Sequence, residues 1–277
     1  MPGKQTTTKS KSRTFGTQTS GREKESLEGK EKGIQVGTYP DITEKAALTM
    51  EKGRRECFPK INKAGKEVYL FMRGKKELIQ RLKNAFIRDK RVVENYGGRY
   101  IGLAENLKRC EGELYRGLPE QCLVIIEFKD MAHAERWTQS SGSFKQRDFP
   151  SPSDEMEMFA TPVSYLPSEG LSAFQLTEMY GLQCSPSEFN EKYVSPVTQC
   201  LNKRRIYHGV VATNHVNRLR NCMIRPDTYV LLYCAEDECK LTDFYDSAEY
   251  RKYKDFRQMA VAETNTCFFK LQPVTNS

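Results

Sequence analysis

Residues 95–102 read NYGGRYIG, in which two adjacent glycines are followed at once by an arginine and an apolar run. Gly97 and Gly98 predict a helix end with a positive φ and then a tight turn into a strand, because a β-branched residue would be strained there. The apolar positions before the glycines recur at the spacing of an amphipathic helix; they are Ile79, Leu82, Phe86 and Val93. We therefore expect a helix, a structural glycine turn and a strand.

The same order of segments occurs twice along the chain. EVYLFMRG at 67 matches AFQLTEMYG at 173, GRYIGLA at 98 matches RIYHGVVA at 205, and QCLVIIEF at 121 matches TYVLLYCA at 228. Trp137 and Phe244, on the helices expected after the third strands, are 107 residues apart, as are the third strands themselves. Last strands close the units at EMEMFATP and NTCFFKLQP. Each unit thus has the order β-α-β-β-α-β of a ferredoxin-like fold.

The chain divides by composition into a tail and two units. Residues 1–60 form a basic tail that we expect to be mostly disordered, with a short capped helix near 42–52, because its first part is mainly Lys, Thr, Ser, Gly and Glu. The first unit is expected at 61–162 and a second, divergent unit at 172–277. A Pro-containing linker at 163–171 should join them.

The first helix of the second unit has a clear start and an internal interruption. Ser185 is the expected N-cap, with Pro186 at the first helical position and Glu188 completing a capping box. Pro196 lies inside the same helix and lacks an N–H donor. We therefore predict a kink at Pro196.

The third strands, LVII at 123–126 and YVLL at 229–232, are apolar at every position. A strand with one wet face should alternate, so both faces of each sheet must be covered. Helices cover one face, and the sheet of the sister unit is the expected cover for the other. At about 25 cal/mol per Å2, leaving such a face in water would cost several kcal/mol. We therefore predict an α+β chain whose two units form one intramolecular barrel.

Several short motifs of the first unit belong together with the glycine turn. They are Y-G-G-R-Y at 96–100, C-E-G-E-L at 110–114, L-V-I-I-E-F at 123–128, a helix that contains Trp137, and S-S-G-S-F at 140–144. Over about residues 66–161 this combination strongly resembles the domain-of-unknown-function 1330 family of the dimeric α/β-barrel superfamily. The second unit resembles the family weakly, over about 173–272.

The second unit departs from the family pattern at two places. Ile206-Tyr207-His208-Gly209 stands where Gly-Gly-Arg is expected, and D-S-A-E-Y at 246–250 has alanine in place of proline. The resemblance implies tandem ferredoxin-like units paired as a dimeric α/β barrel, with small ligands between helices and sheet. The superfamily includes monooxygenases, isomerases, decarboxylases and haem proteins. The resembled family has no agreed activity, so it implies no catalytic residue and no cofactor.

Four residues of the first unit are candidates for ligand binding: Arg99, Tyr100, Glu127 and Trp137. Strand alternation sends Arg99 and Tyr100 to opposite faces. Arg99 either closes a pocket and pairs with a ligand carboxylate or with Glu127, or it is a surface residue that covers apolar area. Glu127 would suit acid–base chemistry if buried, but not at the wet end of a strand. Trp137 is either a pocket wall or part of the core.

Three residues of the second unit complete the candidates: Tyr207, His208 and Tyr233. His208 is the best of the three histidines for a haem ligand or catalytic base, although a strand histidine is more often only packed or hydrogen-bonded. Five tyrosines make the expected second pocket more aromatic than the first; they are Tyr207, Tyr229, Tyr233, Tyr245 and Tyr250. This asymmetry favours one functional unit and one scaffold unit.

The charge and the third strands argue against a nucleic-acid partner. The net charge is +8, but residues 1–60 hold 13 Lys and Arg and 8 Asp and Glu, so the rest of the chain is near balance. RNA-recognition modules share this strand order, but they need basic residues, glycine and alternating aromatics on strand three. QCLVIIEF is instead aliphatic.

Motifs for cofactors, metals and membranes are absent from the sequence. The nine cysteines include no C-x-x-C pair, and the chain has no phosphate loop, Rossmann glycine pattern, H-E-x-x-H or G-x-S-x-G motif. No run approaches the ~20 apolar residues of a membrane span. We expect a cytoplasmic protein with reduced, structural thiols.

The function that these observations favour is binding of a small organic molecule in a pocket between sheet and helices, with or without its chemical transformation. The alternative is a non-catalytic scaffold or protein-interaction module, with the tail as the partner-binding segment; RNA binding has less support. The sequence alone names neither the ligand nor a reaction.

Overall fold

The structure is a computed structural model. It describes residues 62–112, 121–140, 156–167, 171–204, 206–220, 222 and 224–273. The expected tail at 1–60, with its helix near 42–52, lies outside the described residues.

The first unit has the ferredoxin-like order. Its elements are β2 (Val68–Lys75), η1 (Lys76–Leu78), α2 (Ile79–Asn95), β3 (Gly98–Ala104), β5 (Gln121–Phe128), α3 (Met131–Gln139) and β6 (Met156–Pro162). Their strands lie antiparallel in the order β6-β2-β5-β3. The first and third strands of the unit are therefore central, as the repeat predicts.

The second unit repeats this order with more helices. Its elements are β8 (Ala173–Leu182), α5 (Pro186–Phe189), η3 (Asn190–Val194), α6 (Ser195–Lys203), β9 (Tyr207–Thr213), β11 (Tyr229–Ala235), α7 (Glu238–Tyr245), α8 (Ala248–Ala260) and β12 (Val261–Lys270). Its strands lie in the order β12-β8-β11-β9. The two units thus have the same strand order, and the predicted α+β fold with two antiparallel sheets is confirmed.

Each unit also contributes a short strand to the sheet of the other unit. β4 (Lys108–Glu111) follows β3 in the chain but pairs with β12, and β10 (Asn217–Arg220) follows β9 but pairs with β6. Both sheets therefore have five strands. The sequence carries no signal of this exchange, because KRCE and NRLR are short and polar and pair with strands far away in the sequence.

Two matching backbone contacts join the sheets at their ends. Leu103 N donates to Gln272 O at 3.0 Å and Gln272 N donates to Leu103 O at 2.9 Å. At the corresponding place of the other unit, Ser164 N donates to Val210 O at 2.8 Å.

The expected linker contains a short strand. It is β7 (Tyr165–Leu166), which pairs with β1 (Asn62–Lys63). The limits of the domains at 61–162 and 172–277 stay a prediction.

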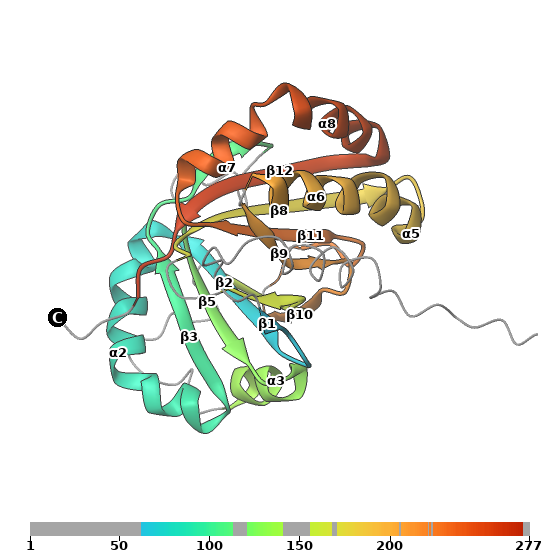
Figure 1. The fold of residues 1–277 in the computed structure, drawn as a ribbon. Coiled ribbons are helices and arrows are strands. Elements are labelled where there is room, and N and C mark those ends of the chain that lie inside the picture. The colour runs from blue at the N-terminus through green and yellow to red at the C-terminus, as the bar shows by residue number, and fades with distance from the viewer. Residues whose placement is uncertain are drawn as a thin grey trace, which may run out of the picture. The chain divides into compact units, whose positions relative to one another are not determined.

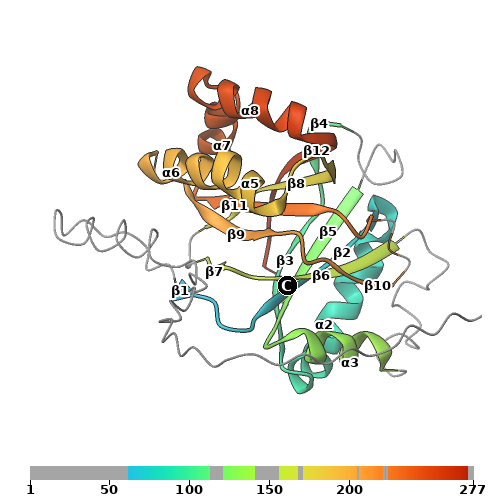
Figure 2. The same cartoon turned by 90° about the vertical axis from the view of Figure 1, so that its right-hand side faces the viewer.

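The third strands are covered on both faces, as predicted. Leu123 and Ile125 of β5 pack in one cluster with Val230 and Leu232 of β11, so the inner faces of the two sheets cover each other. The alternate residues of the two strands pack against the helices of their own units. Figures 1 and 2 show α2 and α3 outside the first sheet and α5, α6, α7 and α8 outside the second.

The helices of the second unit differ from the expectation in two ways. Ser185 Oγ accepts from Glu188 N at 3.1 Å, as predicted for an N-cap. The π-helical turn η3, which was not expected, ends just before Pro196, and the kink at Pro196 stays a prediction. The helix α8 was not predicted. It begins where Ser247 Oγ accepts from Tyr250 N at 3.2 Å, within the D-S-A-E-Y segment.

The two glycines of the opening stretch have different roles. Gly97 has a φ of 70° at the end of α2, a conformation that glycine adopts without strain. A Cβ on Gly98 would lie 2.6 Å from Phe128 Cε1 and 2.7 Å from Val93 Cγ1. Gly97 thus ends the helix, and Gly98 lets β3 approach the core closely.

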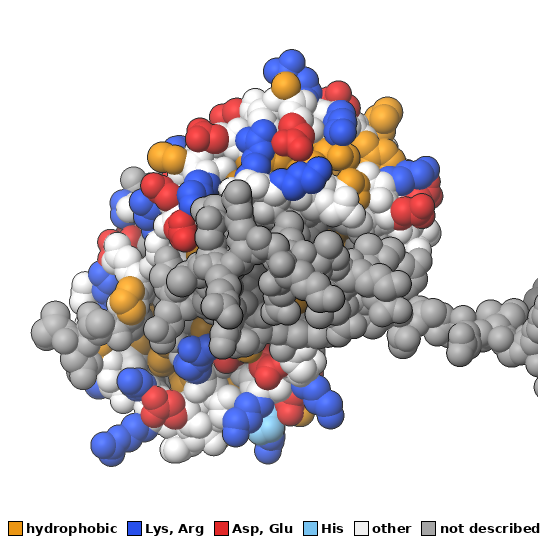
Figure 3. All heavy atoms as spheres, viewed as in Figure 1, with side chains coloured by type: hydrophobic (Ala, Val, Ile, Leu, Met, Phe, Trp, Pro, Cys, Tyr) orange, Lys and Arg blue, Asp and Glu red, His pale blue; other side chains and the backbone are white. Residues whose placement is uncertain are grey.

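Basic and acidic side chains are interspersed on the surface. On the face shown in Figure 3, Lys and Arg lie next to Asp and Glu over both units. Described pairs of this kind include Lys108 with Glu238 at 3.2 Å and Arg225 with Glu263 at 3.2 Å. This distribution agrees with the near balance of charge outside the tail.

Candidate functional site

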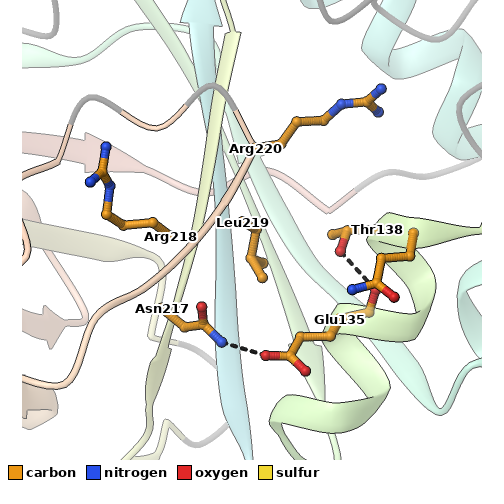
Figure 4. Close-up of a pocket in the computed structure, with 7 residues that line it drawn as sticks. Glu135, Thr138, Asn217, Arg218, Leu219 and Arg220 are labelled. Atoms are coloured by element: carbon orange, nitrogen blue, oxygen red, sulfur yellow. Dashed lines mark hydrogen bonds between the residues drawn. The ribbon is translucent and has the colours of Figure 1, made fainter.

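A cleft lies between α3 of the first unit and β10, the strand that the second unit contributes to the first sheet (Figure 4). It has a volume of about 440 Å3 and is lined by Glu135, Thr138, Gln139, Asn217, Arg218, Leu219 and Arg220. Asp130 caps α3 by accepting from His133 N at 2.9 Å and so fixes the start of the helix that carries Glu135. The cleft exists only because the strand exchange brings β10 beside α3.

One hydrogen bond joins the two walls of the cleft. Asn217 Nδ2 donates to Glu135 Oε1 at 2.6 Å. Figure 4 shows Arg218 and Arg220 extending to opposite sides of β10, and Arg218 Nη2 donates to Cys222 O at 2.7 Å. Burial lowers the pKa of Arg220. The cleft thus offers a carboxylate, amide groups and a partly desolvated guanidinium, which can bind a ligand with both donors and acceptors.

The two units differ at the position where the cleft opens. Thr138 of α3 corresponds to Tyr245 of α7, since the repeats are 107 residues apart. Tyr245 fills its place in the second unit and packs on Phe268 and Tyr250 at centroid distances of 5.8 and 5.2 Å. A threonine is too short to do this, so space remains beside α3.

The corresponding layer of the second unit holds a buried polar cluster, which we call the Arg257 cluster. It consists of Glu111, Tyr193, Tyr233, Tyr245, Tyr250 and Arg257. Arg257 Nη2 donates to Glu111 Oε2 at 2.5 Å, and Tyr245 donates to the same oxygen. The hydroxyls of Tyr193 and Tyr250 lie 2.7 Å apart. Glu111 comes from β4, so this cluster also depends on the strand exchange.

Burial governs the ionisation of the Arg257 cluster. It raises the pKa of Tyr193, Tyr233, Tyr245 and Tyr250, so these phenols stay neutral at ordinary pH. Burial alone would lower the pKa of Arg257, but the neighbouring tyrosines and Glu111 outweigh it and raise the pKa. Arg257 and Glu111 therefore form one ion pair among neutral phenols.

The structure places the first-unit candidates apart from the cleft. Arg99 Nη2 donates to Glu127 Oε2 at 3.0 Å across neighbouring strands, and its side chain is 67% exposed. Tyr100 packs on Phe86 at a centroid distance of 4.5 Å on the other face of β3. Trp137 is buried in the helix-side core. Apart from the pair Arg99 and Glu127, these side chains do not converge, and none of the four lines the cleft.

The second-unit candidates are only partly described. Tyr207 and His208 lie in β9, and their side chains are outside the described part of the structure. Tyr233 is buried in the helix-side core, within the Arg257 cluster. The roles proposed from the sequence for these residues and for the first-unit candidates stay predictions.

Sequence reasoning did not find the residues that matter most in these layers. Glu111 and Arg257 are 146 residues apart, and Asn217 and Glu135 are 82 apart. No local motif marks them. A usable signal was present for α8, where Tyr250, Tyr253, Arg257 and Ala260 recur at spacings of three and four.

The described residues were also compared with the requirements of a metal site and of a membrane-spanning helix. Among them, no group of three or more His, Cys, Asp or Glu side chains is arranged to hold a metal ion. No helix in this part of the chain is long and apolar enough to cross a membrane.

Comparison with known proteins extends the fold assignment. No family model matches the chain, and no curated protein is significantly similar to it in sequence. Its structure is similar to an anthrone oxidase-like protein, with a TM-score of 0.52 and 11% identity over 77% of this chain and 95% of that protein. This similarity shows that the two proteins share a fold.

Two further solved structures are more distantly similar. A protein of Lactobacillus acidophilus proposed to be a monooxygenase has a TM-score of 0.44 and 9% identity over 74% of this chain and 93% of its own. A protein of Fusobacterium nucleatum, also proposed to be a monooxygenase, has a TM-score of 0.45 and 11% identity over 76% and 94%.

Proposed function

We propose that this protein binds a small polar organic molecule in the cleft between α3 and β10. The observation that carries the proposal is the volume of about 440 Å3 beside the bonded pair Glu135 and Asn217. Pockets for small organic molecules commonly measure about 300–1,000 Å3 and carry a few polar groups that orient the ligand. The cleft meets the condition of size, and its lining is mainly polar, which suits a polar ligand more than an apolar one.

Each lining group has a definable part in this proposal. Arg220 would bind an anionic or carbonyl oxygen, because a guanidinium carries five N–H donors in a planar fork that suits such an acceptor. Glu135 and Asn217, which already bond across the cleft, would accept from and donate to the ligand. Leu219 provides apolar contact area. A ligand with an oxygen acceptor at one end and a donor at the other fits this arrangement best.

We further propose that the chain is a tandem relative of the domain-of-unknown-function 1330 family. The support is the Y-G-G-R-Y motif at 96–100, whose glycines end α2 and admit β3 to the core. Homologues of this chain should then keep glycine at both positions. Substitution of Gly97 and Gly98 by larger residues in most homologues would count against membership.

Native mass spectrometry of the freshly purified full chain tests the binding proposal. A discrete mass excess that disappears on denaturation is the expected result. Leu219→Trp should remove the excess by filling the cleft, whereas Ile87→Trp, at an exposed site on α2, should retain it. Equal melting temperatures of the two variants would exclude unfolding as the cause. Absence of any excess, or an excess indifferent to Leu219→Trp, would favour the scaffold alternative.

A further inference from the structure

Helix α8 is an addition to the ferredoxin-like order. That order needs one helix between the last two strands of a unit, but both α7 and α8 lie between β11 and β12. The inner side of α8 packs on the second unit through its buried residues, Tyr250, Arg257 and Ala260. Its outer side carries Met259, which is 75% exposed, the highest value among the large hydrophobic residues that the structure describes. Packing within the described chain therefore does not account for the outer side of α8.

Met259 is the exposed end of an apolar stripe on α8, which we call the α8 patch. It consists of Tyr253, Phe256 and Met259, at spacings of three residues, and its two rings are half-buried. The ring of Phe256 stacks on Phe189 of α5 at a centroid distance of 6.4 Å, so the patch reaches the seam between the two helices. Figure 3 shows hydrophobic side chains gathered where α8 faces α5 and α6.

The charged side chains of α8 leave an excess of positive charge. Glu249 pairs with Arg204 at 3.0 Å, so this carboxylate is neutralised within the chain. Within the described residues, three basic residues and one acidic residue of α8 form no ion pair; they are Arg251, Lys252, Lys254 and Asp255. Charge complementarity therefore favours an acidic partner over a basic one.

Lys252 brings positive charge next to the patch. It precedes Phe256 by four residues and Met259 by seven, which places all three on one side of the helix. Its Nζ lies 4.6 Å from the centre of the Tyr253 ring. The lysine is exposed, so a carboxylate of a partner can reach it while apolar side chains of that partner cover the patch.

The shape of the patch distinguishes two kinds of acidic surface. An amphipathic helix that binds lipid needs a wide exposed apolar face, but Met259 alone projects from α8, and both rings are half-buried. A helix of another protein can instead place its own apolar side chains against half-buried rings in a seam between helices. Methionine suits such contacts, because its flexible thioether adapts to the partner. A protein helix therefore fits the α8 patch better than a membrane surface.

We infer that the α8 patch is a docking surface for another protein, which binds it through an acidic amphipathic helix. Apolar residues of that helix contact Phe256 and Met259, and its carboxylates pair with Lys252. The surface belongs to the second unit and shares no residue with the lining of the cleft between α3 and β10. The inference therefore does not depend on the function proposed for the cleft.

Selection of phage-displayed helical peptides on the full chain tests the inference without knowledge of the natural partner. The library would hold peptides of roughly 18 residues, which form about five helical turns. Peptides enriched on the wild-type chain should carry apolar residues at i, i+3 or i+4, and i+7, together with a net negative charge. Enrichment of basic peptides, or no enrichment beyond that on a Met259→Asp chain, would overturn the inference.

Two variants assign the contact to the patch in binding titrations with the most enriched peptide. Met259→Asp places a carboxylate in the patch and Lys252→Glu reverses the charge beside it, so each should weaken binding at least about tenfold. Ile87→Asp is the matched control, since it changes the other exposed large hydrophobic residue of the described chain, on α2, and should leave the affinity unchanged.

The outcome of these titrations is decisive because all three positions are exposed and their substitution should change stability little. Equal losses of affinity in Met259→Asp and Ile87→Asp would show that the patch is not the contact. An affinity indifferent to Lys252→Glu would contradict the acidic character of the partner.

Two other occupants of the patch would give different results. Binding of the full chain to phosphatidylserine vesicles that Met259→Asp abolishes would assign the patch to a membrane surface. A dimer in sedimentation velocity that Met259→Asp dissociates would assign it to a second copy of the chain. Either result overturns the inference, whereas the mass excess expected for the cleft should persist in Met259→Asp whichever occupant is found.

Discussion

Arg73 Nη1 donates to Glu178 Oε1 at 2.7 Å and so joins the first sheet to the second. Arg73 Nε also donates to Glu157 on β6, and the guanidinium carbon lies 5.5 Å from the centre of the Phe159 ring. Tyr180 donates to the other oxygen of Glu178 at 3.0 Å. This buried network fixes how the two sheets pack face to face, because Arg73 must keep one position to bond with both carboxylates.

Arg73→Met should destabilise the protein strongly. The substitution leaves Glu157 and Glu178 buried without their cation, and breaking a buried ion pair in this way typically costs about 3–5 kcal/mol. Urea unfolding measures the change in the free energy of unfolding.

Arg99→Met is the matched control for this prediction. Arg99 and Glu127 also lie on neighbouring strands, but the arginine is largely exposed, so the loss should be about 0–1 kcal/mol. Equal losses in the two variants would show that the barrel interior does not depend on Arg73.

Gly98→Ala should lower the free energy of unfolding through steric overlap and not through backbone strain. The added methyl would overlap Phe128 and Val93, and overpacking of this kind costs about 1–3 kcal/mol. Gly65→Ala provides the comparison, since its Cβ would meet only the two side-chain oxygens of Glu67, at ordinary contact distances. Thermal unfolding should show a lower melting temperature for Gly98→Ala alone.

The parts of the fold that could be predicted are those with a local signal. Leu123 to Ile126 are apolar at consecutive positions, which requires cover on both faces, and Gly97 ends a helix whatever lies around it. The pairing of Arg73 with Glu178 has no such signal, because the two residues are 105 positions apart and only the facing of the sheets brings them together.

The candidate sites were the least predictable part, for the same reason. Glu111 and Asn217 lie on short exchanged strands whose composition is that of an exposed loop. Their partners, Arg257 and Glu135, belong to helices of the other unit. A sequence that repeats predicts two similar units, but it does not indicate which segments cross between them.

The thiols should divide into two classes by reactivity. Cys110 and Cys239 are exposed, whereas the buried described thiols are Cys122, Cys200, Cys222, Cys234 and Cys267. Burial raises the pKa of Cys122 and Cys234 to about 12, so little thiolate forms there. Ellman's reagent should label the exposed pair first, the half-buried Cys184 more slowly and the buried thiols only on denaturation. A Cys57→Ser background removes the cysteine outside the described residues, and fast labelling of all thiols in it would contradict the packing.

Stability should fall as the pH rises above about 9. The thiols of Cys222 and Cys267 have their pKa raised by burial from 9.0 to about 12, so the folded chain keeps protons that the unfolded chain loses. Protons bound by the folded state alone make unfolding more favourable as pH increases, and the effect develops between about 9 and 12. Urea unfolding at about pH 7 and about pH 10 measures this change in the free energy of unfolding.

Two variants test whether the buried thiols cause the effect. Cys267→Ala should reduce the pH dependence of the free energy of unfolding, whereas Cys239→Ala, at an exposed site, should not. A stability independent of pH over this range would disagree with the burial of these groups.

The full chain should be a monomer in solution. A single ferredoxin-like unit would need a second copy to cover the apolar face of its sheet, but here Leu123 and Ile125 are covered by Val230 and Leu232 of the same chain. Size-exclusion chromatography with light scattering on the full chain should therefore give the mass of one chain, 31.9 kDa, over a wide range of concentrations.

Arg73→Met offers a second measurement of the same prediction. Weakening the contact between the sheets exposes their apolar inner faces and should promote association. A wild-type chain that is an obligate dimer would mean that the sheets pair between two molecules and not within one.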